Sequence, residues 1–474
     1  MVPPADDHDC GWKAYAEHQE RRAAQLEDRL TALEKAFKRK SERREKSKLP
    51  PAVAKKPATS EEKKQTRRAM AELRDTKLET VIEQLPVPPS ACACDACGNT
   101  ELREVGKGKP STIYEYIPPS FQKVVLMRQT LACKCGRLIT AEAPARVGEK
   151  TRYAPSFVAH LCTSKLADSI PQHRLEKEYK RLGIPIARST MNALLHRAAT
   201  ELKPLHDAAC AMVKKGRVVG ADETSVRQAN LDKKAFMWTF NTPELSVYKY
   251  AETRSGKVAV EMLGESEGVI VVDQYTGYNQ VTKPGMRVRA GCMAHTRRKI
   301  FESTAHAGFD EALELIGKLY EVEREAKEAG LEGTAEHLAM RTERSRPLFA
   351  QLLSWGRKQR GRHEPRSGAG RAVNYLMKNR AALRVFLIDA EVPIDNNASE
   401  RDMRPVAMGR SNYLFFQHKE SGERHATLYT LVKSAEKNGL NPTAYLADVL
   451  VRVHTHPQSR IEELLPHRWK PPDG

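Results

Sequence analysis

Short apolar runs in the middle of the chain predict a β-sheet. Two of them read Val-Val-Gly-Ala at 218–221 and Val-Ile-Val-Val at 269–272, and an aspartate follows each directly. Two further apolar segments flank Asn-Thr-Pro-Glu at 241–244, whose turn residues predict a β-hairpin. The expected strands cover residues 218–222, 236–240, 246–250, 268–273 and 287–295, with a helix at 257–263 after the third strand.

Helical spacing of apolar residues precedes this sheet. Within residues 155–203, the pattern predicts a helix at 172–181, a Gly-Ile-Pro-Ile turn and a second helix capped by Ser189 or Thr190. A helix-turn-helix, whose second helix enters the DNA major groove, has this pattern, but so do helix pairs that contact only protein. In the first case the residues that face DNA are Arg188, Asn192, His196 and Arg197.

Three more segments are predicted to be helical. A polar region at 310–386 follows the sheet, and Asn441-Pro442 begins the last helix. Near the N-terminus, apolar residues recur at three- and four-residue intervals over 16–37, the a/d pattern of a coiled coil. This pattern lasts for only about three heptads, so a lone amphipathic helix fits it as well. If the helix pairs, it makes the protein a dimer.

Three carboxylates are candidates for a shared site. Asp222 and Asp273 end two apolar strands, a poor place for a core residue and a good one for a site residue. Glu400 follows the triplet Asp-Asn-Asn at 395–397, residue types that cap helix N-termini. We therefore expect Glu400 in the first turn of a short helix, where unpaired amides favour an anion. Each acid taken singly could instead merely end a strand or cap a helix.

Converging carboxylates favour a metal site. Two like charges about 4 Å apart repel by roughly 4 kcal/mol at an effective dielectric constant near 20. Such a cluster must therefore protonate, bind cations or separate. Hard oxygen ligands select Mg²⁺ or Mn²⁺, and two such ions clamp the attacking and leaving oxygens of a phosphoryl transfer. We expect two ions held by Asp222, Asp273 and Glu400.

A cluster of cysteines predicts a second metal site, of structural type. Cys94-x-x-Cys97 followed by glycine has the form of a zinc knuckle, and Cys133-x-Cys135 supplies a second pair. These four thiolates are the expected ligands of one Zn²⁺. Because the second pair is tighter than the usual Cys-x-x-Cys, Cys92 is a rival for one position. Buried cysteines without a metal are the alternative.

Composition narrows the partners. The 474 residues carry a formal net charge of +19, so a polyanion is the first expected partner. Charge alone does not separate DNA from RNA or from an acidic membrane surface. No apolar run is long enough for a membrane span, and the N-terminus lacks the features of an export signal. We therefore expect a cytoplasmic protein, and the family resemblance described next implies a bacterial one associated with the nucleoid.

Several motifs, in order and spacing, resemble the transposases of insertion-sequence family 66. The resemblance extends over nearly the whole chain, to its ending at 463–469. The motifs are Ala-Asp-Glu-Thr at 221–224, the strand ending in Asp273, Cys-Met-Ala-His-Thr-Arg-Arg at 292–298, Asp-Asn-Asn at 395–397 and Gly-Arg-Ser-Asn-Tyr-Leu-Phe at 409–415.

This resemblance implies a DDE catalytic triad on a ribonuclease-H-like fold, with the three acids at Asp222, Asp273 and Glu400. It also favours a functional role for His295 as a proton shuttle, a metal-proximal residue or a phosphate contact. A lone histidine at a strand end is otherwise more often structural. Arginines beside the acids suit phosphate, although some could simply balance the acidic charge. These candidates are Arg297, Arg298, Arg404 and Arg410.

The expected fold is multidomain α+β, with a ribonuclease-H-like α/β core that contains a helical insertion. The predicted parts are a coiled-coil or basic helix (1–49), a linker and helix (50–90), a zinc-binding module (91–145), a helical DNA-binding region (146–210), the first part of the core (211–308), the helical insertion (309–390), the second part of the core with Glu400 (391–432) and a C-terminal helical region (433–474).

The expected function is that of a DNA transposase. It would cut phosphodiesters at the ends of its element with Mg²⁺ or Mn²⁺ and transfer the freed 3′-hydroxyl to target DNA. Its partners would be double-stranded DNA, a second copy of the chain and small accessory proteins that such elements usually encode. Two rivals stay open: a metal-dependent nuclease without strand transfer, and a zinc-containing DNA-binding regulator.

Overall fold

The computed structural model describes residues 15–27, 61, 64–65, 68, 119–132, 138–141, 146–147, 151–303, 308–413 and 415–471. Residues 15–27 are helical, as the heptad pattern predicts, and the rest of that pattern lies outside the described residues. Strands β1 (Thr130–Ala132) and β2 (Leu138–Thr140) form a small antiparallel pair. In the described part of the chain, no helix is both long and apolar enough to cross a membrane.

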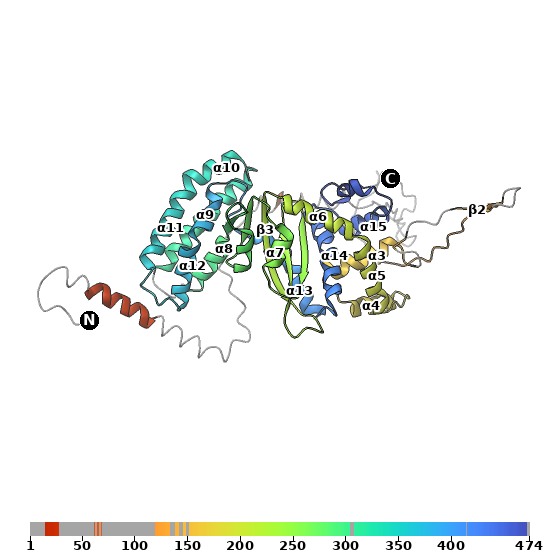
Figure 1. The fold of residues 1–474 in the computed structure, drawn as a ribbon, viewed down its shortest axis with the longest axis horizontal. Helices are drawn as coiled ribbons and strands as arrows, with labels where there is room; N and C mark the ends of the chain where they lie inside the picture. Colours follow the sequence, from red (N-terminus) through yellow and green to blue (C-terminus); the bar gives the residue numbers. More distant parts are fainter. Residues whose placement is uncertain are drawn as a thin grey trace, which may run out of the picture. The chain divides into compact units, whose positions relative to one another are not determined.

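A mixed five-stranded sheet forms the centre of the larger unit (Figure 1). Its spatial order is β5-β4-β3-β6-β7. Strands β3, β4 and β5 pair antiparallel with their neighbours, while β6 and β7 run parallel to β3. The strands are β3 (Val218–Val226), β4 (Ala235–Asn241), β5 (Ser246–Ala251), β6 (Val269–Val272) and β7 (Val288–Gly291).

The predicted hairpin and the helix after it are confirmed. Strands β4 and β5 pair from Phe236↔Ala251 to Asn241↔Ser246, and the turn is closed by the bond from the Thr242 amide to the Leu245 carbonyl. Helix α7 spans Lys257–Leu263, the range that the apolar spacing predicts.

Two predicted strand boundaries are wrong. Strand β3 does not end at Asp222 but continues to Val226, because its other edge stays paired with β4 as far as Ala235. The fifth strand does not reach residue 295: β7 ends at Gly291, where its pairing with Val272 of β6 also ends. The chain then turns into helix α8 (Met293–Phe301).

Helices that precede and follow the sheet in sequence cover its β5 side (Figure 1). Helix α14 packs along the edge strand β5, and its hydroxyls accept bonds from strand amides: Thr430 from Tyr248 at 2.9 Å and Ser434 from Ser246 at 3.0 Å. The exposed backbone edge is thereby satisfied. These helices are α3 (Pro155–Leu166), α4 (Gln172–Arg181), α5 (Arg188–Glu201), α6 (Lys203–Lys215), α14 (Lys419–Lys437) and α15 (Pro442–Arg452), followed by the 3₁₀ segment η5 (Gln458–Leu464).

Helix caps in this group follow the sequence in one case and depart from it in another. The side chain of Asn441 accepts bonds from the amides of Thr443 and Ala444, which confirms the predicted start of α15. Helix α5 begins at Arg188, after Ala187, without a side-chain cap, so the prediction that Ser189 or Thr190 caps it is wrong.

The predicted helical insertion forms the β7 side of the unit (Figure 1). A buried arginine holds it together: Arg341, 1% exposed, binds the Glu323 carboxylate and the carbonyls of Phe386 and Val392. Its elements are α9 (Phe309–Glu328), α10 (Ala335–Met340), the π-helical turn η3 (Arg341–Ser345), α11 (Arg346–Gln359), α12 (Gly368–Leu383) and the 3₁₀ turn η4 (Val385–Leu387). The chain then returns to the sheet as α13 (Asn397–Tyr413).

Candidate active site

Two of the predicted acids lie where neighbouring strands separate. Strands β3 and β6 pair in parallel only as far as Gly220↔Val271. The same register, carried two residues further, places Asp222 level with Asp273. Beyond Gly220, the edge of β3 that faces β6 therefore has no strand partner. Both aspartates come after the point where the two strands separate. Parallel pairing brings acids at these positions to one edge of the sheet.

The N-terminus of α13 fills this gap. The buried Asn396 side chain donates to the Ala221 carbonyl at 2.7 Å, so it replaces the missing strand partner of β3. Its amide oxygen accepts from the Ser399 hydroxyl at 2.6 Å, and that hydroxyl accepts from Asn241 at 2.8 Å. Gly220 faces this cluster, where an added Cβ would lie 2.7 Å from the Ser399 oxygen. A side chain at this position would push the Ser399 hydroxyl and the Asn241 side chain out of their hydrogen-bonded positions.

Glu400 lies in the first turn of α13, as predicted, although the helix is 17 residues long and not short. The helix start is tied to the insertion and to α8 as well as to β3. Asp395 accepts a bond from the Tyr320 hydroxyl at 2.8 Å, and the Ile394 carbonyl accepts from the amide of Met293 at 3.1 Å. Three separate elements thus fix the position of the Glu400 backbone.

The charges of the other two acids affect the pKa of Asp222. Burial is the main cause that raises the pKa of Asp222, to about 7, and the carboxylates of Glu223, Asp273 and Glu400 add to it. The amide of Glu223 opposes the rise by donating to Asp222 at 2.9 Å. A buried carboxyl with this pKa near two other acids favours either a proton or a cation. The donor set is all oxygen, which suits a hard divalent ion.

Glu400 also has unsatisfied bonding capacity. Its Oε1 is buried without a hydrogen-bond partner, and so is Nδ1 of His295, which lies 3.7 Å away. Arg298 approaches the other carboxylate oxygen at 3.6 Å. A buried carboxylate oxygen without a hydrogen-bond donor is free to bind a cation. The residue types of the three acids fit a divalent metal ion, but within the described residues their oxygens do not all lie within 4.8 Å of one another, so an ion would have to draw them together.

The prediction that His295 lies at a strand end is wrong, because His295 lies in the first turn of α8. The helix starts at Met293, directly after the extended residue Cys292. Cys292, His295 and Glu400 have donor atoms within 4.8 Å of one another. Burial raises the pKa of Cys292 to about 12, so its thiol is neutral and binds the Asn396 amide rather than a hard ion.

The residue next to Asp222 has a separate role. Glu223 is almost fully buried, and its carboxylate binds the Arg254 guanidinium and the Tyr278 hydroxyl, the latter at 2.6 Å. Tyr275 adds a cation–π contact to Arg254, with 4.1 Å between the guanidinium and the ring centroid. Adjacent strand residues point to opposite faces. Glu223 therefore anchors β3 through these groups.

The four arginine candidates take different positions. Arg410 binds the Thr224 hydroxyl at 3.0 Å and the Ser225 carbonyl at 2.8 Å, so it satisfies the open edge of β3 further along the strand. Arg298 is half-exposed beside Glu400, Arg297 is partly buried on α8 and Arg404 is exposed on α13. Of these four arginines, Arg298 contacts one of the three acids, Glu400.

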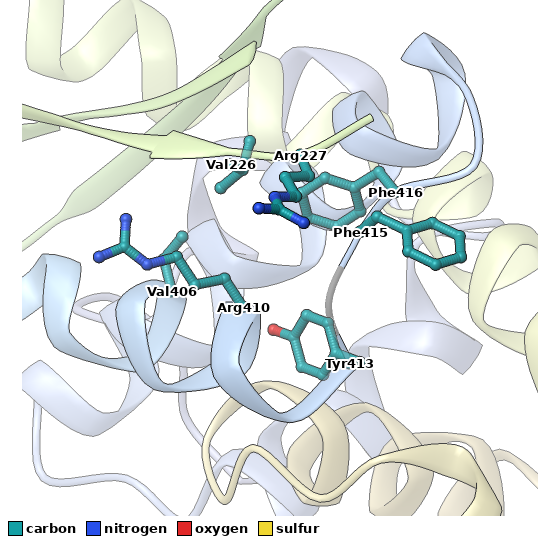
Figure 2. A pocket seen from close by; sticks show the side chains of 7 residues that line it. All are labelled: Val226, Arg227, Val406, Arg410, Tyr413, Phe415 and Phe416. Atoms are coloured by element: carbon teal, nitrogen blue, oxygen red, sulfur yellow. The ribbon is translucent and has the colours of Figure 1, made fainter. Parts of the chain in front are cut away.

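A small hollow beside Arg410 is not a substrate pocket (Figure 2). Its volume is about 10 Å³, room for a single water molecule. It lies where the end of β3 meets the end of α13 and is lined by Val226, Arg227, Val406, Arg410, Tyr413, Phe415 and Phe416.

The proposed DNA-facing residues of α5 divide into two groups. Arg197 is exposed, and Arg188 is exposed with an ion pair to Glu176 at 3.2 Å. His196 instead faces α14, where Arg424 lies 3.0 Å from its Nδ1, and Asn192 is partly buried. Burial and then Arg424 lower the pKa of His196, so it is neutral at pH 7. The zinc ligands Cys94, Cys97, Cys133 and Cys135, and the rival Cys92, lie outside the described residues.

Sequence reasoning missed the residues that hold the acids in place. Asn396, Ser399 and Asn241 make the junction between α13 and β3, and Tyr320 reaches it from the insertion. Asn396 lies in the Asp-Asn-Asn triplet at 395–397, whose residue types predict a helix cap but not the bond to β3. Nothing in the local pattern around Tyr320 distinguishes it from a core residue of an amphipathic helix.

Comparison with known proteins gives consistent matches. The model of a family described as "Transposase IS66 family" matches residues 150–424, more than half of the chain and all three acids. A second model, "IS66 C-terminal element", matches residues 430–467. Two similar relatives are the uncharacterized proteins y4hP and y4qI of Sinorhizobium fredii (strain NBRC 101917 / NGR234). Each is 29% identical, over 81% and 83% of this chain and 74% and 76% of the relative.

Proposed function

The chain belongs to the IS66 family of transposases, and on that premise we propose that it cleaves phosphodiester bonds at the ends of its insertion sequence and joins the freed 3′-hydroxyl to target DNA. The observation that supports the proposal is that Asp222 and Asp273 follow the point where β3 and β6 separate, and that the charges of Asp273 and Glu400 help to raise the pKa of Asp222. Family membership alone supports DNA processing; the acids supply the chemistry proposed for it.

We propose that the central sheet is ribonuclease-H-like. The support is its topology: three antiparallel strands come first in sequence, and the fourth and fifth lie on the other side of the first, parallel to it. The first and fourth of these strands carry the two aspartates. The glutamate then arrives on a helix after a long helical insertion. This arrangement gives each acid a separate rigid support, which suits a site that must hold its geometry.

The three carboxylates would hold two Mg²⁺ or Mn²⁺ ions. When bound, such ions activate the attacking oxygen and stabilise the leaving oxygen of an in-line phosphoryl transfer. The protein's part is to position and to deprotonate its ligands. Asp222, whose pKa burial raises to about 7, must lose its proton for metal to bind. The fixed start of α13 keeps Glu400 aimed at the same point without reorganisation.

His295 and Arg298 would act through Glu400. With its Nδ1 3.7 Å from the Glu400 oxygen, His295 can hold a proton beside the carboxylate or restrict its rotation. Arg298 is half-exposed, so its guanidinium can turn from Glu400 to a phosphate of bound DNA. Arg404, also exposed and one helical turn after Glu400, is placed for a similar contact.

The remaining parts would bind DNA. Exposed Arg188 and Arg197 on α5 are proposed phosphate contacts, and one Zn²⁺ on the cysteines between 94 and 135 would stabilise a further DNA-binding module. Dimerisation through the N-terminal helix would hold two element ends together. These roles rest on residue type and on the family, and they extend the proposal beyond the acidic site.

Replacing one acid tests the proposal. We expect Asp273→Ala to retain DNA binding and to lose cleavage by at least about 10³-fold, since it would remove one of the carboxylates that hold the proposed ions. The assay measures cleavage of element-end DNA with Mn²⁺ and joined products on a supercoiled target. The control is Asp232→Asn, an exposed acid in the β3–β4 loop, which should cleave like the unmodified protein.

Two results would contradict parts of the proposal. If Asp273→Ala still cleaved, the acids would not form the active site. If the unmodified protein cleaved but gave no joined product, the chain would be a nuclease without strand transfer.

A further inference from the structure

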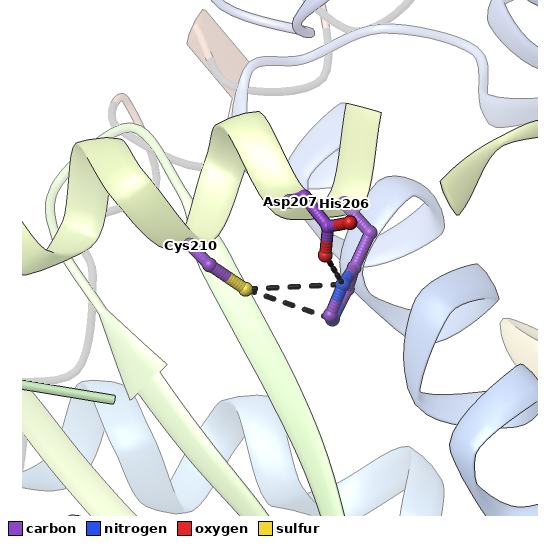
Figure 3. Close-up of side chains that lie close together, drawn as sticks. All are labelled: His206, Asp207 and Cys210. Atoms are coloured by element: carbon purple, nitrogen blue, oxygen red, sulfur yellow. Dashed lines mark hydrogen bonds and ion pairs between the residues drawn. The ribbon is translucent and has the colours of Figure 1, made fainter. Parts of the chain in front are cut away.

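A second cluster of ionisable side chains lies on α6, on the opposite side of the unit from the helical insertion. His206, Asp207 and Cys210 gather on its face toward β5 (Figure 3). His206 is 4% exposed, Asp207 is exposed and Cys210 is partly exposed. The proposed transposition chemistry uses none of them.

Both ring nitrogens of His206 face hydrogen-bond acceptors. Nε2 lies 3.0 Å from the Tyr248 carbonyl, and Nδ1 lies 3.3 Å from Oδ1 of Asp207. A carbonyl and a carboxylate cannot donate, so both contacts are satisfied only if each nitrogen carries a proton. Burial lowers the pKa of His206, but its bonds to Asp207, Cys210 and Tyr248 outweigh burial and raise it to about 9. His206 is therefore an imidazolium at pH 7.

The sulfur of Cys210 lies equally close to both nitrogens of the charged His206 ring. It lies 3.8 Å from Nδ1 and 3.8 Å from Nε2. An atom equidistant from both nitrogens does not lie along the lone pair of either one. Because both ring nitrogens already face oxygen acceptors, neither offers a lone pair to a metal ion in this arrangement. The cluster is instead a cation with an ionisable thiol beside it.

A second cation strengthens this environment. The ammonium of Lys249, on β5, adds a favourable charge and a hydrogen bond to the thiolate, after the larger contribution of His206. Burial opposes ionisation, yet the net pKa of Cys210 is lowered. In Cys162 and Cys292, where burial dominates, the pKa is raised to about 12. Electropositive, partly exposed surroundings are those of reactive cysteines.

We propose that Cys210 is a nucleophilic thiolate and a site of covalent modification by soft electrophiles, with hydrogen peroxide as the reactant class. The thiolate attacks one peroxide oxygen, the S–O bond forms while the O–O bond breaks, and the hydroxide that leaves takes a proton from solvent. Sulfur is oxidised by two electrons to a sulfenic acid, and the peroxide is reduced to water. This inference does not depend on the proposed function.

Alkylation of the full-length, folded protein tests the nucleophile. Iodoacetamide is added for fixed times between pH 6 and pH 9, and peptides that contain Cys210 and Cys162 are quantified by mass spectrometry in the same sample. We expect the rate at Cys210 to reach half its maximum at a lower pH in the folded protein than at the same residue in denaturant. Cys162 should be labelled only after denaturation. A midpoint for Cys210 that is no lower in the folded protein than in denaturant, or labelling only after denaturation, would overturn the proposal.

A milder variant tests the ion pair. In Asp207→Asn, the exposed carboxylate that stabilises the imidazolium becomes a neutral amide, so the alkylation midpoint of Cys210 should rise. Capture of the sulfenic acid by dimedone after peroxide treatment at pH 7 should fall several-fold. Asp232→Asn, which neutralises an exposed acid in the β3–β4 loop outside this cluster, serves as the matched control and should leave both readouts unchanged. Equal midpoints in Asp207→Asn and the unmodified protein would contradict the assigned charge on His206.

Discussion

Burial of the Asp222 carboxylate lowers the stability of the metal-free protein at neutral pH. Without metal, its folded-state pKa of about 7 lies well above that of an unfolded aspartate. The folded protein therefore holds a proton that the unfolded chain releases as pH rises. Stability contributed by this proton is complete at low pH and is lost progressively up to about pH 7, above which the loss stays constant. A bound divalent ion would remove the conflict, because it stabilises the charged form.

Asp222→Asn should accordingly stabilise the metal-free protein while abolishing cleavage. The amide resembles the neutral carboxyl in shape, so melting temperatures near pH 4 should match. Above pH 7 the variant should be more stable, by on the order of 4 kcal/mol at most, since each tenfold change in proton affinity is worth about 1.4 kcal/mol. Thermal unfolding in a chelator across pH 4–8 measures this difference. A variant less stable than the unmodified protein at pH 8 would contradict the assigned burial of the charge.

The residues that carry the acids could be predicted from the sequence for a simple reason. Apolar strands that end in aspartate are visible in a window of a few residues, and Asp222 and Asp273 were found this way. Cys292 is different, because its role as acceptor for the Asn396 amide depends on residues more than 100 positions apart. No local pattern encodes such a contact.

At the scale of elements, helix α13 replaces a missing strand. Strand β3 extends well past its pairing with β6, and α13 satisfies the exposed edge at two places: Asn396 at Ala221 and Arg410 at Ser225. The sequence predicts both elements but not this junction. The apolar run predicts that β3 ends at Asp222, whereas pairing with β4 on the other edge continues to Val226. The apolar alternation likewise predicts that the fifth strand extends to His295, whereas β7 ends at Gly291.

Breaking the junction should affect catalysis more than stability alone explains. Asn396→Ala leaves the Ala221 carbonyl without a donor in a buried place, at an expected cost of about 1–3 kcal/mol. It also frees the start of α13, so Glu400 loses its fixed aim and cleavage should fall by at least about tenfold at a temperature where the variant is folded. Circular dichroism and the cleavage assay measure the two effects.

The matched control lies on the same helix. Asn412→Ala removes a bond of 2.8 Å from α13 to the Ser169 carbonyl, far from the acids along the helix. We expect it to lower stability but to leave cleavage of the folded protein nearly unchanged. Equal losses of cleavage in the two variants would mean that the junction at Asn396 has no special role.

At the scale of the whole molecule, the sheet lies between two helical groups. The insertion was predicted as helical from its polar periodicity, and its internal support, the buried Arg341 with Glu323, was not. A buried arginine in a sequence with 79 lysines and arginines has no distinguishing mark. What the sequence does predict is the excess of positive charge, and the proposed function assigns it to DNA.

This charge makes a quantitative prediction about DNA affinity. Each phosphate contact releases a counterion, so the logarithm of the binding constant should fall linearly with the logarithm of salt concentration, with a slope of about −0.9 per contact. Arg197→Ala, which removes an exposed charge on α5, should make the slope shallower by about one and weaken all DNA sequences alike. Arg217→Ala is the control, because Arg217 is already paired with Asp389 and Glu391 and should not contribute to the slope. Fluorescence anisotropy from 50 to 300 mM salt distinguishes the two, and an unchanged slope in Arg197→Ala would remove α5 from the DNA-binding surface.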